Sequence, residues 1–121
     1  MSKIMLACHE KSTSDILTKL LKTEGYRVHA FSDLSEARGA VESGGFNLLI
    51  TMAVQNFDPE LDIIKQSKQK SPAVPIIAIT ESGNSELKDK VQECQPYTII
   101  EKPLKVDLLL STVQKAIDFA D

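Results

Sequence analysis

Hydrophobic residues recur along this 121-residue chain with two alternating periods. Between short apolar runs, apolar residues return every three or four positions, as they do on one face of a helix. The runs themselves are rich in Ile, Leu, Val and Tyr, which is typical of strands. The chain therefore predicts five strands alternating with five helices. The predicted strands are residues 3–8, 26–30, 46–52, 75–80 and 97–101.

Capping and turn residues mark the ends of the predicted helices. Ser, Thr, Asp and Asn favour the N-cap position, Pro favours the first turn, and Gly favours the position just after the last turn. Such residues stand between the apolar runs at each connection. The predicted helix starts are residues 12–15, Ser32 or Asp33, and the pair Asp58 and Pro59; the predicted stops are Gly25 and the pair Gly44 and Gly45, with a further turn at residues 82–84.

The order of these elements predicts the layout of the sheet. Helical connections of this length suit right-handed crossovers between parallel strands. The run at residues 46–52 is almost continuously apolar, which predicts a strand buried on both faces, whereas residues 26–30 alternate like an edge strand. We predict an α/β fold, a (βα)5 flavodoxin-like three-layer sandwich with a parallel sheet in the order 2-1-3-4-5. Residues 1–121 are expected to form one domain.

Composition and charge narrow the class of function. Fourteen basic and seventeen acidic residues give a net charge of −3, and no predicted face gathers lysine and arginine, so direct binding of nucleic acid is not expected. No apolar stretch approaches 18 residues and no signal peptide is recognisable, so we expect no membrane contact and a cytoplasmic location. Cys8 and Cys94 lack CxxC spacing and are predicted to be reduced thiols.

Ligands of open parallel sheets bind beyond the carboxyl ends of the strands, so the residues at those ends are the candidates for chemistry. The third predicted strand delivers Met52 to this edge. A thioether cannot serve as a general acid, a base or a phosphoryl acceptor, and it is a poor ligand for hard cations. The strand ends also present Cys8, His9, Glu10, Thr80, Glu81, Lys102 and Pro103.

The segments KIMLACHE, EGYRV, NLLITM, VPIIAIT and IIEKPL resemble the receiver domain of two-component response regulators. Thr80 and the pair Lys102 and Pro103 fall at the spacing that receivers use for their hydroxyl residue and their lysine-proline pair. The resemblance covers essentially the whole chain. It implies a phosphoryl group accepted by an aspartate at the end of the third strand. It also implies an acidic pair that holds Mg²⁺ and an aromatic residue in the fifth strand that reports phosphorylation.

The resemblance fails at the positions that would carry this chemistry. Cys8 and His9 stand where the acidic pair would, Met52 stands where the phosphoacceptor would, and Ile99 takes the place of the switch aromatic. Glu10 alone cannot supply the oxygen ligands that Mg²⁺ requires. We therefore expect a degenerate phosphorylation pocket with no catalytic residue, no metal and no cofactor.

Within this pocket, Met52 is expected to pack as an apolar plug against Thr80. Lys102 is expected to pair with a nearby carboxylate, from Glu10, Glu81 or Glu101. Glu81 is the first choice because it directly follows Thr80, where receivers usually carry a small residue. The Thr80 hydroxyl is expected to bond to backbone.

Cys8 is expected to be a small buried hydrophobe. Two alternatives stay open, a reactive thiol whose pKa Lys102 lowers and a metal site that includes His9.

We interpret the chain as a phosphorylation-independent, receiver-like protein-interaction module in two-component-type signal transduction, and not as an enzyme. In receivers the fourth helix, fifth strand and fifth helix form the usual surface for partners and dimers, so another protein or a second copy is the expected partner. Alternatives are a thiol-based or small-ligand sensor built on Cys8, His9 and Lys102, and a receiver with a displaced acceptor such as Asp58. The expected partner surface comprises Glu86, Lys88, Asp89, Lys90, Tyr97 and the exposed side of residues 104–119.

Overall fold

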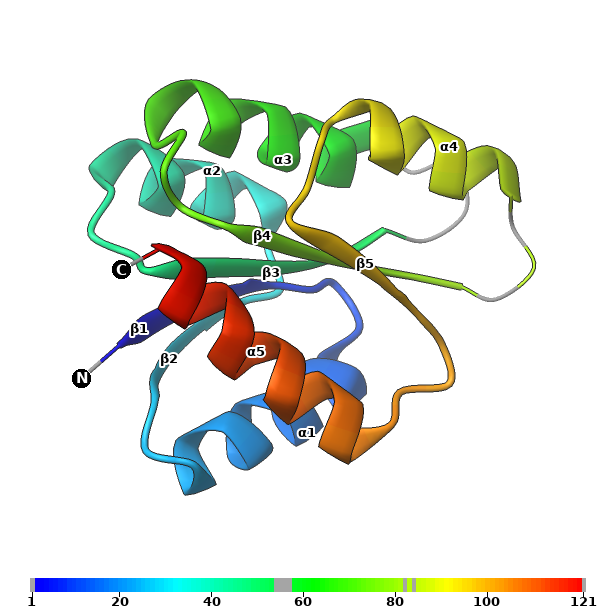
Figure 1. The fold of residues 1–121 in the computed structure, drawn as a ribbon. Coiled ribbons are helices and arrows are strands. Elements are labelled where there is room, and N and C mark those ends of the chain that lie inside the picture. The colour runs from blue at the N-terminus through cyan, green and yellow to red at the C-terminus, as the bar shows by residue number, and fades with distance from the viewer. Residues whose placement is uncertain (1, 54–57, 82, 84, 121) are drawn as a thin grey trace.

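The computed structural model describes residues 2–53, 58–81, 83 and 85–120, in which parallel strands alternate with helices (Figure 1). The type and order of the elements agree with those predicted, and the ends differ by one or two residues. The elements are β1 (Lys3–Ala7), α1 (Lys11–Thr23), β2 (Arg27–Phe31), α2 (Leu34–Ser43), β3 (Leu48–Ala53), α3 (Asp58–Lys70), β4 (Ile76–Thr80), α4 (Ser85–Glu93), β5 (Thr98–Glu101) and α5 (Val106–Ala120).

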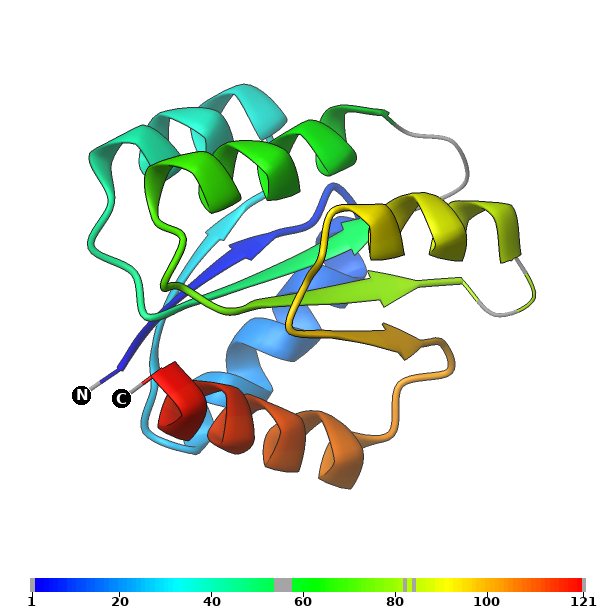
Figure 2. The ribbon, with the colours of Figure 1, turned by 45° about the horizontal axis from the view of Figure 1, so that its top comes forward.

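The strands form one five-stranded parallel sheet in the order β2-β1-β3-β4-β5, which confirms the predicted fold class and winding. Helices α2, α3 and α4 cover one face of this sheet, and α1 and α5 cover the other (Figure 2). β2 is an edge strand with mostly exposed side chains, as its alternating sequence predicted. The central position of β3 explains why its sequence is apolar on both faces.

The sheet separates two hydrophobic cores. Side chains of a strand alternate between its faces, so Ile50 and Met52 of β3 pack toward α1 and α5, while Leu49 packs toward α2, α3 and α4. All three are buried. Burial of this apolar surface is the main favourable contribution to folding.

Helix ends follow the predicted signals, except at the starts of α1 and α3. Asp33 caps α2, since its carboxylate accepts a hydrogen bond from the Ser35 amide at 2.8 Å. Gly25 and Gly44 have φ angles of 94° and 72°, a left-handed conformation that glycine adopts without strain, and they follow the last turns of α1 and α2. Helix α1 begins at Lys11 with Glu10 as its N-cap residue, so the predicted cap at residues 12–15 is wrong.

The physical reason lies in the side chain of Thr13. Its hydroxyl donates a hydrogen bond to the Glu10 carboxylate at 2.6 Å, which ties the first turn to Glu10, at least two residues before the predicted cap. At α3, Asp58 is the first helical residue, so its predicted role as the N-cap is wrong, whereas Pro59 stands in the first turn as expected. Of the predicted turn at residues 82–84, residues 82 and 84 lie outside the described part of the chain.

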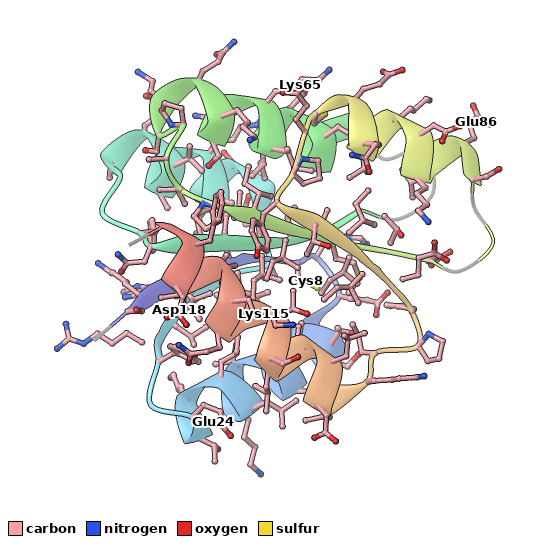
Figure 3. All side chains as sticks on the ribbon, viewed as in Figure 1. Cys8, Glu24, Lys65, Glu86, Lys115 and Asp118 are labelled. Atoms are coloured by element: carbon pink, nitrogen blue, oxygen red, sulfur yellow. The ribbon has the colours of Figure 1, made fainter. Side chains whose placement is uncertain are left out.

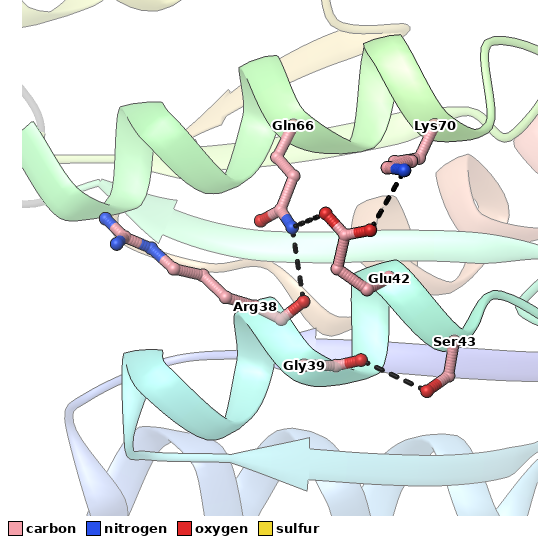
Figure 4. Close-up of polar contacts among 6 residues, drawn as sticks. All are labelled: Arg38, Gly39, Glu42, Ser43, Gln66 and Lys70. Atoms are coloured by element: carbon pink, nitrogen blue, oxygen red, sulfur yellow. Dashed lines mark hydrogen bonds and ion pairs between the residues drawn. The ribbon is translucent and has the colours of Figure 1, made fainter.

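Polar contacts join α2 to α3 on the outer surface (Figure 4). The side-chain amide of Gln66 donates to the Arg38 carbonyl at 3.2 Å and to the Glu42 carboxylate at 2.8 Å. Lys70 approaches the same carboxylate at 3.0 Å. The hydrogen bond from Gln66, with help from Lys70, lowers the pKa of Glu42. These contacts hold α2 and α3 side by side above their shared core.

Candidate functional site

The carboxyl edge of the sheet brings the ends of β1 and β5 together. Cys8 follows β1, is fully buried, and belongs to the core beneath α1 and α5 (Figure 3). Its amide donates to the Phe31 carbonyl at 3.0 Å, and its thiol donates to the Glu10 carbonyl with a sulfur–oxygen distance of 3.5 Å. His9 is exposed beside it. Cys8 therefore occupies a core position, which confirms the prediction that it is a small buried hydrophobe.

Met52 is buried to 1% of its surface at the end of β3, in the core with Cys8. The expected contact with Thr80 is wrong. Met52 pairs with Ile79 across the β3–β4 ladder, and Thr80 is the next residue along β4. Because neighbouring side chains on a strand point to opposite faces, the side chains of Met52 and Thr80 lie on opposite faces of the sheet.

Lys102 forms an ion pair with Glu10, with 3.4 Å between Nζ and Oε1. The prediction that Glu81 would be the partner is therefore wrong; among the described residues, Glu81 takes part in no ion pair with Lys102. The physical reason is that Glu10 is fixed at the start of α1, where the Thr13 hydroxyl holds the same oxygen. The Lys102 amide also donates to the Thr80 carbonyl at 2.8 Å, which ties the ends of β5 and β4. The Lys102–Pro103 bond is cis.

The pKa of Glu10 is held below its ordinary value, first by the hydrogen bond from Thr13 and then by the charge and hydrogen bond of Lys102. Partial burial opposes this shift. The arrangement favours a charged carboxylate at this edge. A group whose pKa is lower in the folded state stabilises the fold above its unfolded pKa, and this contribution is lost as pH falls through the folded value.

We expect Glu10→Gln to lower the free energy of unfolding by no more than about 1 kcal/mol near neutral pH, because the carboxyl is 40% exposed and its ion pair is screened by solvent. Urea unfolding at about pH 7 and about pH 3 tests this, since glutamate titrates near pH 4. The difference between variant and parent should shrink at the lower pH. A difference that grows on acidification would contradict the assignment of the charged form.

Two threonine hydroxyls near this edge lack partners. Thr51 and Thr80 are fully buried, and the Oγ1 atom of neither has a hydrogen-bond partner among the described residues. The expected bond of the Thr80 hydroxyl to backbone is therefore wrong. An unpaired buried hydroxyl is unfavourable by about 1–3 kcal/mol. Across the described parts of the chain, no group of three or more His, Cys, Asp or Glu side chains is placed to hold a metal ion.

The surface of α4 and β5 carries the charged residues predicted for partner binding. Lys88 of α4 forms an ion pair with Glu101 of β5 at 2.7 Å, which raises the pKa of Lys88. Lys90 lies 3.9 Å from Glu86, one turn away on the same helix. Asp89 is exposed between them. The sequence analysis did not include Glu101 in this surface. Its position at the end of the fifth strand, directly before Lys102, could have indicated it.

Two further predicted residues lie on β5 or just before it: Ile99, the predicted switch position, and Tyr97 of the predicted partner surface. Ile99, at the position of the switch aromatic, is partly buried and packs against the core beneath α2, α3 and α4. Tyr97 precedes β5 at the opposite edge of the sheet, with its ring 5.3 Å from that of Phe119 on α5. Tyr97 is thus separated from the charged cluster by the length of β5.

The parallel winding, together with a threonine and a lysine at the ends of β4 and β5, defines a flavodoxin-like signalling domain of the receiver type. The chain belongs to the response regulator receiver domain family, whose model matches residues 4–114. It is thus a receiver domain of two-component signalling, a class of modules that interact with other proteins and are generally not enzymes. Among the described helices, none has the length and apolar composition needed to cross a bilayer.

Similar proteins include the nitrogen assimilation regulatory protein NtrX of Azorhizobium caulinodans, with 25% identity over 118 residues. The match covers 95% of this chain and 26% of that protein, so the chain spans about a quarter of its relative. NtrX from Brucella abortus, crystallised with ADP, superposes with a TM-score of 0.88 at 23% identity, over 99% of this chain and 28% of that one. A CheY-like receiver domain protein from Methanospirillum hungatei gives 0.89 at 20% identity, over 99% and 96%. These structures share the fold.

Proposed function

We propose that this receiver domain works as a protein-interaction module without aspartyl phosphorylation. The observation that carries the proposal is the position of Met52. It is buried in an apolar core at the end of β3, where the family's phosphoacceptor would stand. A buried thioether offers no oxygen to a phosphodonor, and Cys8 and His9 replace the acidic pair that would hold Mg²⁺. The pocket of Cys8, His9, Glu10, Met52, Thr80, Glu81, Lys102 and Pro103 is accordingly a degenerate one.

The contacts of Lys102 support a fixed signalling state. In receivers this lysine contacts the phosphoryl group, whereas here it reaches a carboxylate of the same chain, that of Glu10. The negative charge near the lysine is therefore built into the sequence and needs no donor. Lys88 and Glu101 likewise join α4 to β5. With no phosphoryl group to bind one state better than the other, we expect this element to keep a single dominant arrangement.

The partner binds the surface of α4, β5 and α5. Its charged groups Glu86, Lys88 and Asp89 are exposed on α4, and Lys90 is partly exposed there. Glu101 extends the cluster onto β5. Charge of both signs on one face favours selective and well-oriented binding of another protein. The burial of Cys8 argues against the alternative of a thiol sensor, because buried structural thiols are inert.

Incubation with acetyl phosphate and Mg²⁺ should leave the intact mass of the protein unchanged. The reason is that neither the acceptor nor the metal ligands of a receiver are present. A stable phosphoryl adduct that disappears in Asp58→Asn would instead establish a displaced acceptor and overturn the proposal. The side chain of Asp58 lies outside the described part of the chain, so mass spectrometry is the direct test.

Partner binding should be indifferent to phosphodonor and sensitive to charge on α4. A protein retained from a cell extract by the immobilised domain should be retained equally with and without acetyl phosphate, and lost with Lys88→Glu or Lys90→Glu. Lys88→Glu also breaks the ion pair with Glu101. The double variant Lys88→Glu, Glu101→Lys is the matched control, because it reverses the charge on α4 and keeps opposite charges on α4 and β5. If retention depends on the donor, or if both single variants retain the partner, the proposed mechanism or surface is wrong.

A further inference from the structure

Strand β2 leaves one side of its backbone unpaired. It is the outermost strand on one side of the sheet, and among the described strands it pairs with β1 alone (Figure 1). Residues of a parallel strand alternate in the side to which their N–H and C=O groups point. The Arg27 amide donates to the Ser2 carbonyl at 3.0 Å, and the Phe31 carbonyl accepts from the amide that follows β1, also at 3.0 Å. The alternation therefore turns the backbone groups of Val28 and Ala30 outward, where no described residue pairs with them.

This edge lacks several features that discourage a further strand. Edge strands are often very short, interrupted by proline or distorted by a bulge. β2 has five residues, as β1 does, its sequence RVHAF contains no proline, and its register against β1 is continuous. The side chains of Arg27, His29 and Ala30 are exposed, so the helices beside the strand leave it accessible. The outer side of β2 is therefore open to a further strand.

The charge along β2 defines which strand fits. Arg27 and His29 are on the same face of the sheet as Phe46, whose ring centroid lies 5.8 Å from that of His29. Lys3 is the register partner of Arg27, and its ammonium lies 5.3 Å from the centroid of the Phe46 ring. None of these basic side chains forms an ion pair with a described residue, and Asp33, just beyond β2, caps α2. This face therefore favours acidic side chains on an added strand.

The opposite face of β2 favours apolar side chains. Val28 packs partly buried against the core beneath α1 and α5, and Ala30 is small and exposed. Successive side chains of an added strand point to alternate faces. The strand that fits thus carries acidic residues at every second position and apolar residues between them. The β2 strand of a second copy does not fit, because it would bring Arg27 and His29 against the same basic residues.

We propose that β2 binds an extended acidic segment of another protein as an additional strand of the sheet. Val28 and Ala30 supply main-chain hydrogen bonds, which give affinity, and Arg27 and His29 select the acidic pattern. Their charge also disfavours basic strands, so the open edge is selective. β2 and β5 are the outermost strands on opposite sides of the sheet. The site is therefore separate from the charged cluster on α4 and β5, and the proposal does not rest on the proposed function.

Hydrogen exchange followed by NMR tests the added strand. The probe is a short synthetic peptide of alternating glutamate and valine. At a peptide concentration about ten times its dissociation constant, exchange of the Val28 and Ala30 amides should slow about tenfold. The His29 amide is the internal control, because it points toward β1 and should change much less. The same peptide with lysine in place of glutamate is the charge control and should protect neither amide.

Two sets of variants separate the main-chain contribution from the charge. Ala30→Pro removes an outward N–H, and proline is tolerated on edge strands; it should raise the dissociation constant of the acidic peptide about tenfold. Ala30→Val keeps the N–H and is the matched control. The double variant Arg27→Glu, His29→Glu should lose the acidic peptide and bind the lysine peptide instead, because the charge preference is reversed. Circular dichroism checks that each variant folds.

Unchanged exchange at Val28 and Ala30 with about 1 mM acidic peptide overturns the proposal. Equal protection by the lysine peptide, or equal affinity of Ala30→Pro and Ala30→Val for the acidic peptide, does so too. Exchange that slows with rising protein concentration and without peptide would indicate a second copy as the occupant, and would also overturn it.

Discussion

Met52→Asp is expected to lower the free energy of unfolding by about 3–5 kcal/mol. The variant removes apolar contacts from the core shared with Cys8 and Ile79 and places a carboxylate where 1% of the side chain is exposed. Urea unfolding followed by circular dichroism measures the loss. Met52→Leu is the matched control and should differ from the parent by less than about 1.5 kcal/mol, because it nearly conserves volume and polarity.

The same variant should remain unphosphorylated by acetyl phosphate in the presence of Mg²⁺. Cys8 and His9 still stand where metal-binding carboxylates are required. An aspartate at position 52 that leaves stability unchanged would mean that this side chain faces water. A variant that also gained a phosphoryl group would show that the pocket had kept its chemistry, contrary to the proposed function.

Ile79→Ala should lower the free energy of unfolding by about 2–5 kcal/mol, since it leaves a cavity in the core beneath α1 and α5. Ile79 is fully buried on β4 and is the register partner of Met52. Ile16→Ala makes the same chemical change on α1 at a side chain that is 61% exposed, and should alter stability by no more than about 0.5 kcal/mol. Equal losses in the two variants would contradict the assigned core.

The fold was predictable from the sequence because its signals are local. The apolar run of β3, the alternation in β2 and the glycines after α1 and α2 each depend on a few neighbouring residues. The start of α1 could not be predicted in this way. Several residues near it are suitable N-caps of similar strength, and the hydrogen bond from Thr13 to Glu10 favours Glu10. Local preference cannot choose between such candidates.

The sequence predicted which residues form the candidate site, but it did not predict which of them contact one another. The strand ends followed from the winding of the sheet, whereas the separation of Met52 from Thr80 depends on the register of β3 against β4. Lys102 pairs with Glu10 and not with Glu81 because α1 begins directly after Glu10, and this start could not be predicted from the sequence.

Both ends of the chain lie at the amino edge of the sheet (Figures 1 and 2). β1 starts there, and α5, which runs against the strands, returns to it. Neighbouring ends make a domain tolerant of circular permutation and of insertion into a loop of another protein. They also place a terminal fusion tag at the amino edge, close to the last turn of α5. A label that must leave this edge unobstructed therefore belongs on the connection between β2 and α2, at the carboxyl edge.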